Sequence, residues 1–321
     1  MNSEFRNTSQ TNTSKVLILS QSTMVANSKM AVAQVLVCIF LYINCIMLFS
    51  FFIKDSFRQD SRYILFAHML LVDTIVLLMV DLGVLMSYFY LLLPAGLCIL
   101  ICTFMEVLTT YIPLTLTAMC LERYIAICIP LRHAEISTIQ RTMLGILLIW
   151  ILGFIFSSTD LFIIIVTQPN SFYFVDYICS YEMMLLYIWQ ADLRSVSRLL
   201  LFLAIFIFIL FTYVKIMYVA KAASAEKTSA FKARNTVILH AVQLLLSLTV
   251  LICPFVETAI MQVDFQVFLN VRYFNFIIFT LFPRCLSSLI YGVRDDKFNM
   301  VFQHYLICGL SKKVSSSILS G

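Results

Sequence analysis

Glycine, proline and charged side chains are all scarce in this chain. Its 321 residues include seven glycines and six prolines, too few for the many turns between the short alternating strands of a β-barrel. Charged residues make up only 12% of the chain and hydrophobic residues 61%, whereas a soluble domain has about a quarter of its residues charged. The composition excludes a soluble globular domain, and we expect no nucleic-acid partner because no basic surface is visible.

Grouped metal ligands and catalytic side chains are also missing. The ten cysteines include no CxxC pair, and most lie in or beside apolar runs, where a thiol behaves as a small hydrophobe. The four histidines lie singly in separate segments. We therefore expect no metal, no cofactor and no enzymatic site. A cleavable signal peptide is not recognisable either, because the apolar run from Val16 to Leu19 is too short for a signal core.

What the chain does contain is a series of long apolar runs. Each exceeds roughly 18 residues, the length that a helix needs to cross a bilayer. Backbone polar groups in lipid must be satisfied within the segment, so these runs should be helices. We predict an all-α membrane protein, a seven-transmembrane helix bundle with spans at about residues 30–53, 63–92, 98–127, 142–166, 195–219, 235–261 and 271–292.

Lysine and arginine predict the orientation of this bundle. Fifteen of the 22 lie in the loops after spans one, three and five or in the C-terminal segment, counting Arg123 and Lys215 at the adjoining helix ends. The positive-inside rule assigns these segments to the cytosol. The N-terminus is then extracellular, and the two N-glycosylation sequons at Asn7 and Asn12 agree with this. We expect a multi-pass protein of the plasma membrane with the lipid bilayer as its surroundings.

Three regions follow from this layout. Residues 1–29 are predicted to form an extracellular glycosylated tail, and residues 30–292 the seven-transmembrane bundle. In residues 293–321, apolar side chains recur every three to four positions, which is typical of a short amphipathic helix at the cytoplasmic membrane interface. Cys308 follows this helix and is a candidate for palmitoylation.

Two cysteines fall outside the apolar interior on the predicted outer side. Cys98 begins span three, and Cys179 lies in the long loop after span four. A bridge between them would hold the loop over the bundle, and the chain-entropy model gives such a closure roughly 4 kcal/mol. The alternative is two separate thiols, which tend not to persist in an oxidising compartment.

A charged pair ends span three, within the run MCLERYIAICIPLRH from Met119 to His133. An arginine at the edge of a membrane segment usually has an acidic partner, an aqueous cavity or a function, and here Glu122 directly precedes Arg123. Arg123 could instead simply extend to the lipid headgroups. The 25 residues from Cys98 to Arg123 span about 37 Å as a helix, enough to reach the cytosolic face.

This run resembles the end of the third helix in rhodopsin-like G-protein-coupled receptors, and most closely in the odorant receptors, where a DRY-type triplet is followed by VAIC-x-PLRY. Within that family the chain looks like a fish-type odorant receptor. The segments RYILF at residue 62, KARNT at residue 232 and LIYGVRDDKF at residue 289 are similar to the same group. The resemblance implies a bridge between Cys98 and Cys179. It also implies that Glu122, Arg123 and Tyr124 couple the receptor to a heterotrimeric G protein.

Ionisable residues near mid-membrane need partners. Asp73 lies in span two and Arg284 in span seven, and we predict that they pair directly or through water, because unpaired buried charges are costly. Arg284 shares one helix face with Ser287, Ser288 and Tyr291. This segment departs from the NPxxY pattern of the family, and an arginine beside Asp73 puts in doubt the sodium ion that the wider family holds there.

The outer third of the bundle is the expected ligand site. The candidates are Met105, Glu106 and Thr109 in span three with Cys253 and Glu257 in span six, since the resemblance implies that these helices are neighbours. Two carboxylates in an apolar pocket favour a ligand with a cationic or hydrogen-bond-donating group. Alternatively, each carboxyl is bonded to a backbone carbonyl or protonated, because burial disfavours the charged form.

We therefore expect a receptor that binds a small extracellular molecule, an odorant on the strength of the resemblance, and activates a G protein. A class A receptor for an endogenous amine, peptide or lipid is the alternative. A transporter or channel is a different class, but it would be indicated by inverted repeats, and no such symmetry is recognisable.

Overall fold

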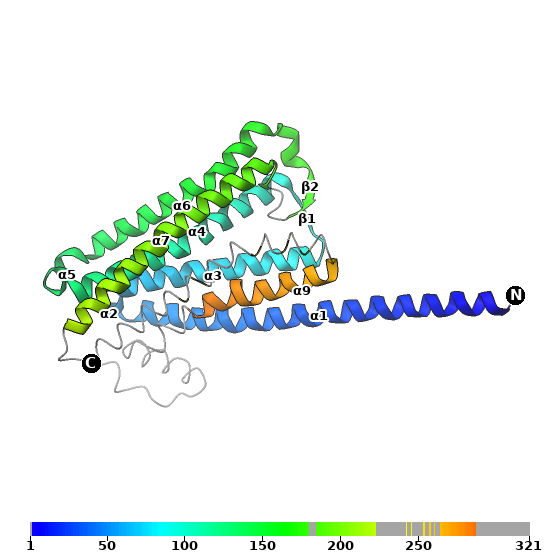
Figure 1. Ribbon diagram of the computed structural model, residues 1–321, viewed down its shortest axis with the longest axis horizontal. Coiled ribbons are helices and arrows are strands. Elements are labelled where there is room, and N and C mark those ends of the chain that lie inside the picture. Colours follow the sequence, from blue (N-terminus) through cyan, green and yellow to red (C-terminus); the bar gives the residue numbers. More distant parts are fainter. Residues whose placement is uncertain are drawn as a thin grey trace, which may run out of the picture.

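The computed structural model of the chain is a bundle of long helices (Figure 1). The structure describes residues 2–179, 184–222 and 264–286 with the single positions 242, 245, 253, 257 and 260, and most of their side chains from residue 24 onward. Ser287, Ser288, Tyr291 and Cys308 lie outside the described residues, as do the side chains of Asn7 and Asn12. The amphipathic C-terminal helix and most of predicted span six also lie outside them.

Five helices of the described part are long and apolar enough to cross a membrane. Their helical bounds are α1 Asn2–Ile53, α3 Ser61–Tyr88, α4 Ala95–Cys128, α6 Ile139–Thr167 and α7 Ile188–Ala222. The apolar part of α1 runs from Met24 to Ile53, close to the predicted first span. The helix itself begins at Asn2 and extends well beyond the bundle (Figure 1).

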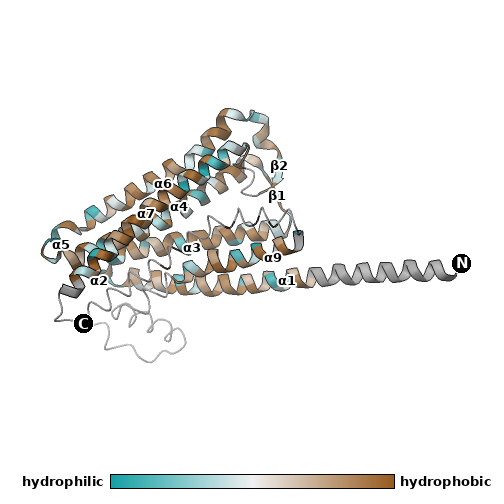
Figure 2. Ribbon diagram, in the orientation of Figure 1, coloured by the Kyte–Doolittle hydropathy of each residue, from teal (hydrophilic) through white to brown (hydrophobic). Residues whose placement is uncertain are grey.

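Helix α4 is the centre of the bundle. Half of its membrane span is buried, against 28% for α1, α6 and α7. It packs against α3 on one side and against α6 and α7 on the other (Figure 1). The helices are mainly hydrophobic along their length (Figure 2), and large apolar side chains such as Leu148 and Phe211 remain about half exposed. Such residues are suited to face lipid, whereas α4 supplies much of the core.

Two short helices lie at one end of the bundle, α2 Asp55–Arg58 and α5 Pro130–Ile136. Both lie within segments that the hydropathy pattern predicts to be loops. The adjoining long helices begin with side-chain caps, because Asp60 accepts a hydrogen bond from the Arg62 amide and Thr138 from the Arg141 amide. The chain therefore reverses direction compactly at this end.

A small sheet and a 3₁₀ helix cover the opposite end. Strand β1, Leu92–Pro94, pairs antiparallel with β2, Asp176–Ile178, with Leu93 opposite Tyr177. The 3₁₀ helix η1, Asn170–Phe174, precedes β2. Hydropathy predicts neither element and extends span two to residue 92, whereas α3 ends at Tyr88. The pairing joins segments over 80 residues apart, so local sequence patterns could not indicate it.

The described part of predicted span seven consists of α9, Phe265–Asn275, and a π-helical segment, η3, Phe276–Leu281. In η3 the Phe282 amide donates to the Ile277 carbonyl, five residues earlier. The next residue is Pro283, which has no amide hydrogen to continue regular pairing. Leu281 packs against Val37 and Leu77, so this segment joins α1 and α3.

Candidate functional site

A cluster of charged side chains lies between α4, α6 and α7. Glu106, Asp160 and Arg194 are each less than a tenth exposed, at 4%, 3% and 8%. The Arg194 guanidinium contacts Asp160 Oδ2 at 2.6 Å and lies 3.8 Å from Glu106 Oε1. Arg198, one turn further along α7, donates to the same oxygen of Glu106. Because Coulomb energies are large away from water, these contacts tie three helices together.

Gln190 extends this cluster toward the start of α7. Its Nε2 donates to Asp160 Oδ1 and to the Met184 carbonyl, both at 2.8 Å. Its Oε1 accepts the Leu186 amide at 3.1 Å. A single buried amide thus holds the chain that leads into α7 against α6.

The charges of this cluster balance. Two carboxylates, Glu106 and Asp160, face two guanidinium groups, Arg194 and Arg198. Hydropathy ends the loop before span five at residue 194, whereas α7 begins at Ile188 and holds Arg194 inside the helix. The protein itself thus supplies two cations to the carboxylates of this cluster, and the ligand role of Glu106 stays a prediction. The sequence left two alternatives for Glu106, protonation or a bond to a backbone carbonyl. Neither of them anticipated the contacts with Arg194 and Arg198.

The other four predicted ligand residues differ in their burial and in their contacts. Met105 is partly buried and packs against the main core, while Thr109 is exposed and donates to the Glu106 backbone carbonyl at 3.0 Å. Cys253 and Glu257 are partly buried, and Glu257 accepts a hydrogen bond from Asn275 of α9 at 2.8 Å. Among the described contacts, none joins Glu257 to Glu106.

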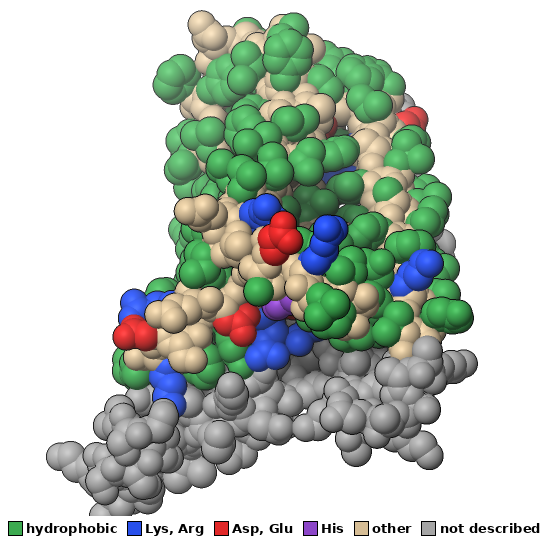
Figure 3. Space-filling model, turned by 90° about the vertical axis from the view of Figure 1, so that its left-hand side faces the viewer, with side chains coloured by type: hydrophobic (Ala, Val, Ile, Leu, Met, Phe, Trp, Pro, Cys, Tyr) green, Lys and Arg blue, Asp and Glu red, His purple; other side chains and the backbone are tan. Residues whose placement is uncertain are grey.

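The charged pair at the end of span three lies at the end of the bundle that carries α5. Glu122 is 8% exposed, with the Arg123 Nε at 3.7 Å from one carboxylate oxygen and the His133 Nε2 at 3.3 Å from the other. His133 belongs to α5, so the pair also fixes that short helix. The Tyr124 ring lies 6.5 Å from the ring of Phe211 in α7. Charged side chains gather at this end, while hydrophobic ones cover most of the upper surface in this view (Figure 3).

Asp73 and Arg284 are buried inside the bundle, at 0% and 9% exposure. Arg284 donates to the Thr280 carbonyl within the π-helical segment. The charge of Asp73 acts on the Arg284 guanidinium. The two residues are thus electrostatic neighbours, and their direct or water-mediated pairing stays a prediction.

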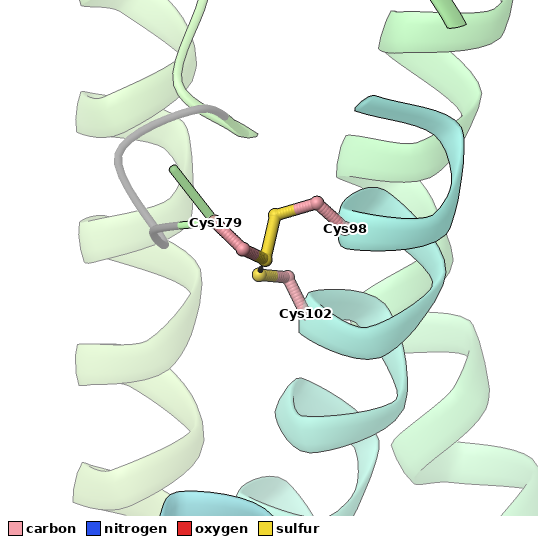
Figure 4. A group of neighbouring side chains, drawn as sticks. All are labelled: Cys98, Cys102 and Cys179. Atoms are coloured by element: carbon pink, nitrogen blue, oxygen red, sulfur yellow. Dashed lines mark hydrogen bonds between the residues drawn. A yellow bond between two sulfur atoms is a disulfide. The ribbon is translucent and has the colours of Figure 1, made fainter. Parts of the chain in front are cut away.

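The disulfide between Cys98 and Cys179 is present, as predicted. It joins the first turn of α4 to the residue after β2, next to the strand pairing. Cys102 lies one turn further along α4, with its Sγ 4.0 Å from Cys98 Sγ (Figure 4). The three sulfurs lie within 4.8 Å of one another, but two of them are bonded together, so the group in this state is not a metal site.

A comparison with known protein families matches a stretch of the chain that includes every helix and strand described above except the N-terminal part of α1. A sequence model of the rhodopsin family of seven-transmembrane receptors matches residues 43–291. The chain belongs to this family. It is also similar to "Odorant receptor 131-2" of Danio rerio, with 45% identity over 289 residues, which cover 88% of this chain and 87% of that protein. The receptor is an all-α, seven-transmembrane, multi-pass membrane protein.

The charged cluster of the receptor contains residues that composition alone did not single out. Gln190, Arg194 and Arg198 recur every four residues, the spacing of one helix face. This polar stripe is a recognisable signal for a buried partner. Asp160, alone in the apolar stretch of α6, is a second one, because intramembrane carboxylates rarely face lipid.

A second group missed by sequence reasoning lies in the receptor core. The His68 Nε2 lies 2.6 Å from the Tyr111 hydroxyl and accepts from the Trp150 indole at 3.2 Å. These residues come from α3, α4 and α6. No periodic pattern relates the three, so only the packing of the helices reveals the group.

Proposed function

We propose that this receptor is an odorant receptor of the plasma membrane, which binds a small extracellular molecule and activates a heterotrimeric G protein. The observation that carries the proposal is the 45% identity to "Odorant receptor 131-2" over 88% of the chain. An alignment of this length covers both ends of the bundle, where a receptor binds its ligand and its G protein. The ERY triplet at Glu122 supports the same conclusion.

The N-terminus is proposed to be extracellular. The disulfide of Cys98 lies at the end of the bundle from which α1 projects (Figure 1), and disulfides persist in oxidising compartments. The charged pair at Arg123 lies at the opposite end. The distribution of lysine and arginine in the sequence supports this orientation independently.

The G protein is proposed to bind around Arg123. In the described state Arg123 is 22% exposed and lies beside Glu122, which also contacts His133 of α5. A ligand that binds better to a bundle with an opened inner end shifts the population toward it, and its differential affinity supplies the free energy. Arg123 and Tyr124 would then become available to the G protein.

The ligand is proposed to bind beside Glu106. Its Oε2 is buried and accepts no hydrogen bond from any residue that the structure describes, whereas its Oε1 faces Arg194 and Arg198. A buried acceptor without a donor is costly, so a ligand that donates a hydrogen bond there gains affinity. Since the two arginines already balance the negative charge, we favour a neutral donor such as a hydroxyl or amide over an amine.

Signalling in cells tests these proposals. Cells that express the surface-tagged receptor with an olfactory G protein are challenged with separate panels of alcohols, amides, amines and carboxylic acids, and cyclic AMP and calcium are recorded. We expect a response in the parent and none in Arg123→Ala at equal surface level. Silence to every panel, at confirmed surface expression, would count against the odorant assignment.

A matched pair of variants tests the ligand site. Glu106→Gln is expected to shift the dose–response curve of an active alcohol or amide by roughly tenfold, the effect of one lost hydrogen bond to a charged acceptor. Asp192→Asn, an exposed acid on α7, serves as the control and should leave the curve in place. Equal curves for both variants would remove Glu106 from the ligand site.

A further inference from the structure

A third sulfur lies beside the disulfide at the outer end of α4. Cys98 and Cys102 occupy successive turns of α4, and both side chains point toward Cys179 (Figure 4). The Cys102 Sγ lies 4.0 Å from Cys98 Sγ and within 4.8 Å of Cys179 Sγ. Cys98 and Cys102 are buried, at 0% and 8% exposure, and Cys179 is partly buried. Cys179 thus faces two cysteines of the same helix.

We propose that Cys102 is a second disulfide partner of Cys179, reached by thiol–disulfide exchange. The Cys102 thiol loses its proton and its sulfur attacks the Sγ of Cys179. The bond between Cys98 and Cys179 breaks, and Cys98 leaves as a thiolate that takes up a proton. One disulfide is lost and one is formed, so the step needs neither an oxidant nor a reductant.

Geometry directs the attack to Cys179 rather than to Cys98. Attack on Cys98 would join two cysteines four residues apart on one helix, whose Cβ atoms are about 5–6 Å apart. A disulfide needs Cβ atoms about 3.5–4.5 Å apart. The product between Cys98 and Cys102 would distort the helix, whereas Cys179 approaches from a separate segment and can adjust.

The exchange moves the anchor of the segment that contains β2. Residues four apart on a helix are displaced by about 6 Å along its axis, so Cys179 would be fastened one turn further into the bundle. The next residue on the same face of α4, after another four positions, is Glu106. The two disulfide isomers therefore hold the end of β2 at two distances from the charged cluster.

A cleavable receptor measures the proposed bridge directly. A protease recognition sequence inserted at α5, between α4 and α6, allows the full-length receptor in membranes to be cut once after its thiols are blocked with N-ethylmaleimide. On a non-reducing denaturing gel the two fragments stay together only if Cys179 is bonded to α4. Wild type and Cys98→Ser should both stay linked, and Cys98→Ser/Cys102→Ser should separate.

Cys120 provides the matched control, since it is a buried cysteine of α4 far from the disulfide. Cys98→Ser/Cys120→Ser should stay linked like Cys98→Ser alone. Separation of the Cys98→Ser fragments, at normal surface level, would overturn the proposal.

A measurement on the wild type covers the case in which Cys98→Ser does not reach the surface. Receptor membranes are incubated in a glutathione redox buffer, blocked and digested without reduction, and tandem mass spectrometry identifies the partner of Cys179. Fragments that assign a share of the bridge to Cys102 support the exchange. A digest in which Cys179 is found only with Cys98 would refute it.

Discussion

The buried pair between Asp160 and Arg194 allows a quantitative test of the charged cluster. Asp160→Ala removes a carboxylate that receives the Arg194 guanidinium at 2.6 Å and the Gln190 amide at 2.8 Å. The side chains of Asp160 and Arg194 are only 5% and 7% exposed, so water cannot replace the lost partner. Removing one member of a buried ion pair costs about 3–5 kcal/mol. In a helical protein of this size we expect an apparent melting temperature lower by roughly 10 °C.

The assay is heating of the detergent-solubilised, fluorescently tagged receptor followed by size-exclusion chromatography. The control is Asp55→Ala, which removes the acid of an exposed pair with Arg58, at 77% and 51% exposure. Exposed pairs contribute about 0–1 kcal/mol, so this variant should melt close to the parent.

A double variant separates the loss of a partner from the loss of packing. Asp160→Ala/Arg194→Met removes both charges, and replacing a buried pair by apolar side chains is often nearly neutral. We expect the double variant to recover much of the stability that Asp160→Ala loses. Equal melting of Asp160→Ala and Asp55→Ala, or additive losses in the double variant, would refute the reasoning.

Three further predictions concern other parts of the receptor. Cys179→Ser removes a bridge that closes a loop of 81 residues, and the chain-entropy model gives this closure about 4–5 kcal/mol. Because Cys102 can replace Cys98 as the partner of Cys179, the surface level of Cys179→Ser, measured by flow cytometry, should fall further than that of Cys98→Ser. Equal losses would contradict the exchange. His68→Phe deprives two aromatic partners of their shared acceptor and should cost about 1–3 kcal/mol, measured by the same melting assay. Glu122→Gln weakens the contact at 3.7 Å that restrains Arg123 and should raise ligand-independent cyclic AMP; an unchanged baseline at equal surface level would count against the restraint.

Several features could be predicted from the sequence because their causes are local. The long apolar runs predict the membrane helices, and the described helices follow them to within several residues at most ends. The disulfide of Cys98 and Cys179 is confirmed, since few cysteines fall outside apolar runs. The proximity of Glu122 and Arg123 follows from adjacency, but the contact of Glu122 with His133 depends on how α5 folds back.

Other features depend on which helix faces meet. Glu106 was recognised as a buried acid, yet its two arginine partners lie 88 and 92 residues further along the chain. Hydropathy placed Arg194 in a loop because a charged residue lowers the apolar average. The structure instead continues α7 through it, since Asp160 offers a partner inside the bundle.

The sequence by itself determined the membrane class, the helical spans and the charge asymmetry of the loops. These depend on the transfer of each segment into lipid and on hydrogen bonds within it, which are properties of single segments. Only the tertiary structure decided that Glu106 lies between two guanidinium groups, that Cys102 lies beside the disulfide, and that His68 joins two aromatic residues. Such contacts depend on the rotation and depth of each helix against its neighbours, because helix packing brings together residues that no sequence pattern relates.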